Sequence, residues 1–518
     1  MSNPTTNALT DFDLCLALAQ PAINSQLHYA WAAWKRRNSF SNEINIMKIR
    51  RNGQLVDSNF GLRDLVVAPL TVSLNVPSGK LGQLRVTMPL TSGRVDFYDE
   101  AEEQPSSFKF GKQDGWSVSF IVDLDKAPID LAALAAIDPD AHQTAAAVIK
   151  TSGLPDAVFS IEYLFMDLTK VDLLLDSDRN VSIPANVPDS ARTKALSCLN
   201  LLLQGDLGKF MLGTVVRRNN NQAVPTFALT DFVFDVHADS ISPQASTLSY
   251  LGMVANHPRP ADIDAARLRL RDGWVSASMV DGSHGLVSGI MAISKSVFMQ
   301  KYLIARLTRL IGRNPDASGL SWSYGNGQTD KWQSSDIIDR EWEKSVQWQL
   351  RLAAVPGSNR IDIGGRVSSH AYMDGYTKRV GKLGHYHTEW IHMEGYQDLS
   401  GSLTLESTGI GTAFQVKPAL TYSFSDPVVT NNAVEGGAKV LTAFEKAFTG
   451  GTTAEKLHNL QAEMVNQISG WLKHILDEFS MTLTQHVFIP PGGGVFTFQN
   501  VRFSPAGDLI FDVIYQAP

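Results

Sequence analysis

Residues Leu14 to Arg37 read LCLALAQPAINSQLHYAWAAWKRR, and this stretch decides the predicted fold. Apolar residues recur in it at the spacings of one face of an α-helix. A second apolar band lies roughly opposite the first, so this helix would be covered on most sides. At about 1.5 Å per residue it would be about 30 Å long. Because the remaining chain is rich in strand patterns, we expect strands to wrap around it. The first face comprises Leu16, Ile23, Leu27, Ala30 and Trp34.

Composition places the chain among folded globular proteins. Its 518 residues are enough for two or three domains. Hydrophobic residues make up 44% and charged residues 19%, which argues against long disordered or fibrous regions. The net charge is -7, and lysine and arginine form no long basic stripe. We therefore expect no nucleic-acid partner.

The cysteines and the first residues bear on the cellular compartment. Cys15 and Cys198 both lie in apolar patterns, so we interpret them as buried thiols, although two cysteines also allow one disulfide. The start of the chain has no basic residue before an apolar run, unlike a signal peptide, and no apolar run is long enough to span a membrane. We expect synthesis in the cytoplasm, and any release would need a route without a signal peptide.

Residues 1–238 are predicted to form a first half. Alternating apolar residues indicate antiparallel strands from Ile44 to Phe97, at 115–129 and at 158–176. Helical patterns cover 141–150 and 191–204, and two further strands end near residue 238. Residues 239–285 are interpreted as a junction that contains a strand-like segment, GWVSASMV, at 273–280.

Residues 286–518 are predicted to form a second half of similar order. A long helical pattern opens at Ile290, strand patterns follow, and a second helical pattern runs from Leu457 to Phe479 before the closing strands. The order helix, strands, helix, two strands thus occurs twice, which indicates an internal duplication. Short matches accompany it, such as Phe-Asp-Val at 234–236 and at 511–513. The predicted fold class is α+β with antiparallel sheets.

Motifs of enzymes and cofactor sites are missing from the sequence. There is no nucleophile elbow, Walker loop, HExxH motif or EF-hand. The glycine clusters at 409–411 and 492–494 lie between strand patterns, so they cannot bring a phosphate to a helix N-terminus. We therefore predict a protein that is not an enzyme and carries no cofactor.

One cluster keeps a metal site open as an alternative. On a regular strand, His385, His387 and Glu389 would share one face at intervals of roughly 7 Å. Two imidazoles and a carboxylate suit zinc or iron, which would allow a metal-dependent hydrolase. The other interpretation is an ordinary exposed strand face.

A basic helical face suggests peripheral membrane contact. The second long helical pattern places its cations together, where they could meet anionic lipid head groups. The alternative is a solvated face over a helix packed on the core. These cations are Lys301, Arg306, Arg309 and Arg313.

Three phrases carry a resemblance to a known family. They are FDLCLALAQPAINSQLHYAWAAWKRR at 12–37, AISKSVFMQKYLIARL at 292–307 and VFTFQNVRFSPAGDLIFDVIYQAP at 495–518. With the order of elements, they resemble the accessory proteins encoded beside botulinum neurotoxin in OrfX-type clusters, in the tubular lipid-binding (TULIP) superfamily. The resemblance implies two halves, each with a long helix wrapped by a strongly curved antiparallel sheet and a second helix. It also implies a toxin-associated role, in some cases insecticidal, and partners among toxins or accessory proteins of the same gene cluster.

The resemblance further implies an apolar groove that holds a lipid or another apolar ligand. Such a groove needs few fixed polar groups, which fits the missing catalytic motifs. The alternative is an interaction scaffold whose groove is filled by its own large side chains, with Trp31, Trp34, Phe298, Tyr302 and Trp471 as plugs. The residues predicted to line the groove are Ile23, Leu27, Trp31, Trp34, Phe298, Tyr302, Leu303, Trp471 and Ile475.

Overall fold

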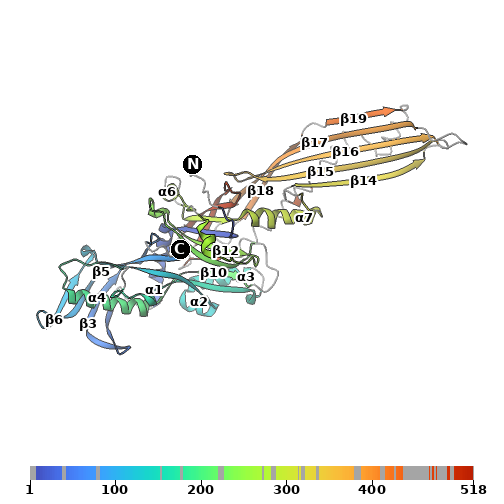
Figure 1. The fold of residues 1–518 in the computed structure, drawn as a ribbon. Coiled ribbons are helices and arrows are strands. Elements are labelled where there is room, and N and C mark those ends of the chain that lie inside the picture. The colour runs from blue at the N-terminus through green and yellow to red at the C-terminus, as the bar shows by residue number, and fades with distance from the viewer. Residues whose placement is uncertain are drawn as a thin grey trace. The chain divides into compact units, whose positions relative to one another are not determined.

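The structure is a computed structural model, and the chain forms two compact units that we describe separately (Figure 1). Unit 1 comprises Met1–Val297, Ser407–Gln415 and Ser480–Pro518, and unit 2 comprises Phe298–Glu406 and Val416–Phe479. The predicted boundaries at 238 and 286 stay a prediction. The residues described are 8–37, 43–76, 82–151, 155–175, 179–219, 227–270, 273–281, 287–312, 314–316, 321–333, 338–377, 387–408, 415–424, 428–435, 466, 470–471, 474, 487–490 and 495–516.

Unit 1 contains a six-stranded antiparallel sheet, here called the central sheet, that joins distant parts of the sequence. Its spatial order is β11-β12-β1-β13-β22-β21. The order is symmetric about the β1–β13 pair, since β12 and β11 lie outward from β1 and β22 and β21 lie outward from β13. Of these six strands, only β12 falls outside the two predicted halves, in the predicted junction. The strands are β1 (Leu14–Ala19), β11 (Leu229–His237), β12 (Thr247–Val254), β13 (Gly289–Ile293), β21 (Val495–Phe503) and β22 (Leu509–Gln516).

Strand β1 corrects the predicted helix, which begins only at Gln20. The leucines at 16 and 18 pack into the core beside the helix, while Cys15, Ala17 and Ala19 pack on the opposite face of the central sheet. Large and small side chains therefore alternate in LCLALA, which is the period of a strand buried on both faces. A short, wholly apolar run gives no polar residue to distinguish this period from a helical one.

The second predicted helix is wrong in the same way at its start. Residues Gly289–Ile293 form β13, a π-helical segment covers Ser296–Ile304, and α7 covers Ala305–Ile311. A Cβ atom added to Gly289 would lie 2.2 Å from the carbonyl oxygen of Ala17, so only glycine allows the close approach of β13 to β1. The order of β1 and α1, a strand followed by a helix, thus recurs in β13 and the helical segments after it.

A ten-stranded antiparallel sheet forms the other large layer of unit 1. Its main path is β2-β3-β5-β7-β8-β10-β20, with β4 and β6 also paired to β5 and β9 to β7. Register shifts interrupt the ladders of β2 with β3, β3 with β5 and β8 with β10, and such bulges bend strands. The strands are β2 (Ile44–Arg51), β3 (Gln54–Val67), β4 (Thr71–Ser73), β5 (Gln83–Asp99), β6 (Gln104–Phe110), β7 (Ser117–Ile129), β8 (Phe159–Asp167), β9 (Asn180–Ser182), β10 (Lys209–Arg218) and β20 (Val487–Ile489).

Most segments of unit 1 that were predicted to be helical are helices, with somewhat different bounds. Helix α1 covers Gln20–Arg37, and the helices predicted at 141–150 and 191–204 correspond to α3 (Pro139–Thr151) and α4 (Asp189–Leu201). A π-helical turn, Leu202–Leu207, continues α4. The sequence did not reveal α2 (Leu131–Ile137). Short 3-10 turns cover Lys112–Asp114, Asp156–Val158, Leu168–Lys170 and Pro243–Ala245.

The junction predicted at 239–285 is more regular than expected, and its strand lies elsewhere. All eight residues of β12 are buried, because the strand lies inside the central sheet between β1 and β11. The segment GWVSASMV is not a strand; it contains the short helix α6 (Ala277–Val280). With α5 (Ile263–Leu268), α6 covers the face of the central sheet opposite α1 through Ala266 and Met279.

Both cysteines are free and buried, which confirms the predicted thiols. Burial raises the pKa of Cys15 and of Cys198, so both thiols stay protonated and unreactive at neutral pH. Cys198 Sγ lies 3.6 Å from the carbonyl oxygen of Ile46, which ties α4 to β2. The two residues have a packing role.

A half-buried ion cluster links the two sheets of unit 1. Glu162 on β8 is 7% exposed, and its carboxylate lies 3.2 Å from Lys126 Nζ and 3.0 Å from a guanidinium nitrogen of Arg217. The same two cations donate to carbonyl oxygens of β11: Lys126 to Phe232 at 2.9 Å and Arg217 to Thr230 at 3.1 Å. One carboxylate thus holds two cations that bind the neighbouring sheet.

Unit 2 contains a sheet of long antiparallel strands, here called the long sheet (Figure 1). Its order is β14-β15-β16-β17-β18, and β19 also pairs with β17. At one end of the sheet, leucine and isoleucine residues of β15, β16 and β17 are buried, such as Leu352, Ile363 and Leu403. The strands are β14 (Ser321–Gln333), β15 (Ile338–Ala354), β16 (Arg360–Thr377), β17 (His387–Thr408), β18 (Gln415–Phe424) and β19 (Val428–Glu435).

The helix predicted from Leu457 to Phe479 lies almost entirely outside the described residues. Within it, the structure describes only 466, 470, 471 and 474, and all four are helical. Among the helices that the structure describes, none is both long and apolar enough to cross a lipid bilayer.

Candidate functional site

Helix α1 lies between the central sheet and the ten-stranded sheet, where the sequence places a ligand groove. Its apolar residues share one core with Leu248 and Tyr250 of β12 and with Leu212 of β10. Only Ser25, His28 and Arg36 are exposed among the α1 residues whose burial is described. The prediction that this helix is covered on most sides is therefore confirmed for Gln20–Arg37.

The four groove residues predicted on α1 are all buried. Ile23, Leu27, Trp31 and Trp34 are each at most 5% exposed. The rings of Trp31 and Trp34 stack, with their centres 4.9 Å apart and their planes 18° apart. Trp34 Nε1 also donates to the carbonyl oxygen of Asp206 at 3.2 Å. Side chains from α1 itself thus occupy this part of the interior.

A small cavity remains beside the middle of α1. Its volume is about 10 Å³, which is room for about one water molecule and too little for an acyl chain. One polar atom at its wall, Gln26 Nε2, has no hydrogen-bond partner among the described residues. The lining residues are Ile23, Gln26 and Leu27 of α1, Leu212 of β10, and Leu248 and Tyr250 of β12.

Two tyrosines near α1 stay neutral at physiological pH. Burial raises the pKa of Tyr250. Burial, with a smaller contribution from Tyr29, raises the pKa of Tyr515 to about 12. Neither phenol can serve as an anion or as a base at neutral pH.

The groove residues predicted near the second long helix lie in unit 2. Phe298, Tyr302 and Leu303 are fully buried, and the guanidinium of Arg306 lies 4.9 Å from the ring centre of Tyr302. Trp471 is half-buried on a helical segment. Ile475 lies outside the described residues. Whether these side chains line a groove stays a prediction.

The predicted basic face is only partly described. Lys301 and Arg309 are exposed, Arg306 is half-buried, and Arg313 lies outside the described residues. The arrangement fits a helix with a solvated side. Contact with a membrane stays a prediction.

The predicted metal cluster begins where the described part of β17 begins. His385 lies outside the described residues, and only the backbone of His387 and Glu389 is described. The ladder with β16 pairs Glu389 with Gly375 and His387 with Tyr376. These two partners are consecutive on β16, so Thr388 is one extra residue on β17. That bulge interrupts the regular alternation on which the shared face depended. Within the described residues, no group of three histidine, cysteine, aspartate or glutamate residues could hold a metal.

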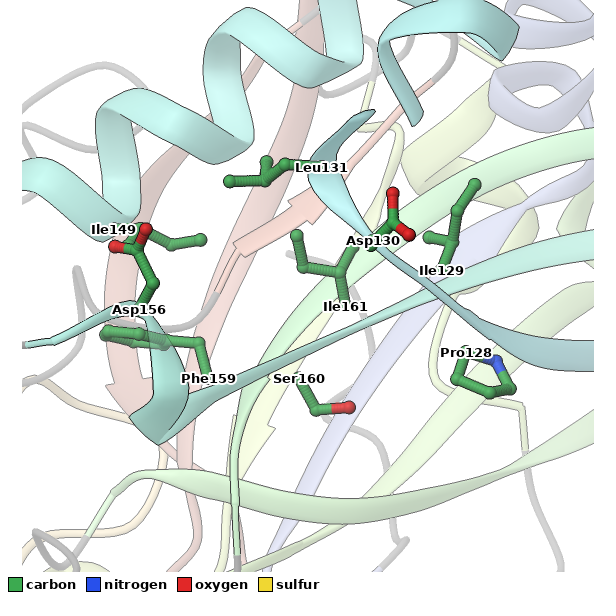
Figure 2. A pocket seen from close by; sticks show the side chains of 9 residues that line it. All are labelled: Pro128, Ile129, Asp130, Leu131, Ile149, Asp156, Phe159, Ser160 and Ile161. Atoms are coloured by element: carbon green, nitrogen blue, oxygen red, sulfur yellow. The ribbon is translucent and has the colours of Figure 1, made fainter. Parts of the chain in front are cut away.

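A larger pocket lies where β7 and β8 meet α2 and α3, and the sequence did not point to it (Figure 2). Its volume is about 390 Å³. It forms because β7 ends at Ile129, Asp130 caps α2, and the chain returns through α3 and a 3-10 turn to β8. The lining residues are Pro128, Ile129, Asp130, Leu131, Ile149, Asp156, Phe159, Ser160 and Ile161.

The pocket has a buried apolar floor and a polar rim. Ile149, Phe159 and Ile161 are 3%, 7% and 6% exposed, respectively. At the rim, Asp130 and Asp156 are exposed. In Figure 2 these two carboxylates lie on opposite sides of Ile161 and Leu131. The floor can bury an apolar group while the rim stays in water.

Sequence signals for this pocket are weak but recognisable. Pro128 and Asp130 mark the change from strand to helix, and Pro155 and Asp156 mark the return to a strand. Alone, each pair predicts only a turn. That they face one pocket follows from the β7–β8 register, which pairs Ile129 with Ile161.

Two solved structures are similar to this chain over nearly its full length. P47 from Clostridium botulinum A2 is 11% identical, with 98% of both chains covered and a TM-score of 0.47. A lipopolysaccharide binding protein is 12% identical, with 98% of this chain and 99% of the other covered and a TM-score of 0.32. No family model and no curated protein matches the sequence.

The topology confirms the predicted fold class. The chain is α+β, with antiparallel sheets, one of them strongly curved, and several helices. The division into two TULIP-like halves stays a prediction, although the symmetric order of the central sheet agrees with it.

Proposed function

We propose that this chain is a non-enzymatic binding protein for a lipid or another apolar molecule, and that the pocket between β7, β8, α2 and α3 takes the apolar part of the ligand. One observation carries the proposal: a hollow of about 390 Å³ with a buried apolar floor. Ligand pockets in proteins are commonly about 300 to 1,000 Å³ in volume and largely apolar.

Binding would depend on apolar burial. A ligand that loses about 200 Å² of apolar surface gains about 5 kcal/mol at about 25 cal/mol per Å². Immobilising the ligand offsets part of this gain, so we expect micromolar or weaker affinity. The lining supplies one hydroxyl, Ser160, and no histidine, cysteine or lysine, so it offers no activated nucleophile.

A substitution that fills the pocket tests the proposal. Purified protein would be titrated with fatty acids, fatty alcohols and alkyl amines, and binding followed by native mass spectrometry and calorimetry. Leu131→Trp adds a ring at the half-buried wall, where Figure 2 shows the Leu131 side chain over the floor, and Leu55→Trp makes the same change at an exposed side chain of β3 as the matched control. We expect stoichiometric binding of at least one probe, a loss of at least tenfold in L131W and no change in L55W. No binding to the unmodified protein, or equal binding to L131W, would exclude this pocket as the site.

We also propose a toxin-associated accessory role, with insecticidal activity as one form of it. The sequence resemblance at 12–37, 292–307 and 495–518 supports this role. Expected partners are toxins or other accessory proteins of the same gene cluster, together with peripheral contact to a membrane. Affinity capture with the tagged chain in cells expressing the neighbouring genes tests the protein partners, and sedimentation with anionic vesicles tests the membrane contact.

An interaction scaffold is the second candidate function, and the packing around α1 favours it. The predicted groove residues on α1 fill the interior there, and the cavity beside them holds about one water molecule. A scaffold would bind a neighbouring gene product with or without lipid. If solvent extraction removed all lipid without weakening such a complex, the scaffold would be the better description.

A further inference from the structure

We propose that the pocket between β7, β8, α2 and α3 selects amphipathic ligands with a cationic head, such as an alkyl ammonium, over neutral or anionic ligands with the same apolar chain. The inference rests on the proposed function, because it names the ligand class of the same pocket. It follows from the charges around an apolar floor.

The lining carries two carboxylates and no cation. Asp130 and Asp156 are exposed at the rim, whereas Ile149, Phe159 and Ile161 form the floor. A fatty chain on the floor would leave its head group at the rim. Head groups there would meet negative charge in water, where an ammonium ion is attracted and a carboxylate repelled.

Asp130 keeps one oxygen for a ligand. Its Oδ1 accepts the backbone N–H of Ala133 at 2.7 Å and so caps α2. This bond fixes the carboxylate at the start of α2, beside Leu131. The cap therefore holds the charge in place, and ligand binding needs little further ordering of the Asp130 side chain.

Cations near the pocket reduce this preference without reversing it. The guanidinium of Arg218 lies 4.5 Å from the ring centre of Phe159, but Arg218 does not line the pocket. Lys126, two residues before Pro128, lies within 3.5 Å of both Glu162 and Asp231 and is thereby neutralised. Lys150 is exposed at the end of α3 but does not line the pocket. The rim itself keeps two negative charges.

The expected selectivity is moderate, because the carboxylates are exposed. A solvent-exposed ion pair commonly changes an equilibrium about 1.5- to 5-fold. Two carboxylates should therefore favour an alkyl ammonium over the neutral alcohol by about 2- to 25-fold. The matching fatty acid should bind more weakly than the alcohol. Added salt should reduce these differences.

The test compares dodecylammonium, dodecanol and dodecanoate, which share one chain and differ in charge. Each would be titrated at pH 7 into the full chain and the double variant Asp130→Asn with Asp156→Asn. Dodecylammonium and dodecanoate would be kept below their micellar concentrations and dodecanol below its solubility limit. Asparagine at 130 preserves the cap of α2, so the fold is maintained. The matched control is Asp57→Asn with Asp264→Asn, two exposed aspartates outside the lining.

We expect the order ammonium, alcohol, carboxylate in the unmodified protein and in the control, and nearly equal affinities in the D130N/D156N variant. Equal binding of all three probes to the unmodified protein, or tightest binding of dodecanoate, would overturn the cationic preference and leave the pocket as an apolar site. Selectivity that persists in the double variant would overturn it as well. If no probe binds, both the preference and the proposed function of this pocket fail.

Discussion

Replacing Leu27 by alanine tests whether the interior beside α1 is filled. Leu27 is 1% exposed and lies at the wall of the cavity of about 10 Å³, between α1, β10 and β12. The change removes three carbons, which costs about 2.4 kcal/mol at about 0.8 kcal/mol per methylene. An added cavity of about 50 Å³ would cost about 1.2 kcal/mol more at about 24 cal/mol per Å³. We expect unit 1 to lose about 3 to 4 kcal/mol of stability.

Urea unfolding followed by tryptophan fluorescence would measure this loss, since Trp31 and Trp34 lie in the same core. The matched control is Leu175→Ala, which makes the same change at a side chain that is 83% exposed. It should alter the free energy of unfolding by less than about 0.5 kcal/mol. If L27A lowers the free energy of unfolding no more than L175A does, and the dependence of that free energy on urea concentration is unchanged, Leu27 lines open space and the filled interior is refuted.

Three further changes test the sheets and their charges. Gly289→Ala places a Cβ 2.2 Å from the carbonyl oxygen of Ala17 and should cost about 1 to 3 kcal/mol in urea unfolding; an unchanged midpoint would contradict the close β1–β13 contact. Glu162→Gln removes the carboxylate of Arg217 and leaves Lys126 with Asp231 alone, so it should cost about 3 kcal/mol, the low end for a broken buried pair; thermal unfolding would detect this, and a neutral result would argue against the cluster. The hydrogen bond from Arg269 holds the pKa of Asp11 below its usual range, so the stability from this pair is present above about pH 4 and lost as the pH falls through the lowered pKa. Asp11→Asn should therefore lower the melting temperature at pH 7 but not at pH 2, and an equal effect at both pH values would contradict this.

The sequence predicted the antiparallel sheets and the main helices, but it misplaced both strands at the centre of the fold. LCLALA before α1 and GIMAI at β13 are five or six residues long and wholly apolar. β1 passes directly into α1 at Gln20, and only Ser294 and Lys295 separate β13 from the next helical segment, so in both places the helical period appeared to extend backward. The signal that could have separated them was the alternation of large and small residues in LCLALA.

The candidate site was less accessible to sequence reasoning than the fold. The groove residues on α1 were correctly predicted to be apolar and enclosed, but periodicity cannot tell whether the enclosed space is empty. Packing decides that, because it depends on Leu212 and Tyr250 from strands far along the chain. The pocket at β7 and β8 was missed because its floor joins Ile149 of α3 to Phe159 of β8 across a turn. The periodicity of a single sequence segment carries no information about such a contact between two elements.

The strand order of the central sheet has a consequence for synthesis of the protein. Of the six strands, β1 is translated first, its neighbours β12 and β13 more than 200 residues later, and β22 last. The Asp508 carboxylate, just before β22, accepts the backbone N–H of Leu9. Until β22 leaves the ribosome, β13 keeps an open edge, and open edges recruit other strands. Contacts this distant in sequence also form slowly. We therefore expect the nascent chain to depend on chaperones until the last strands emerge, and ribosomes stalled before residue 509 to yield aggregation-prone chains.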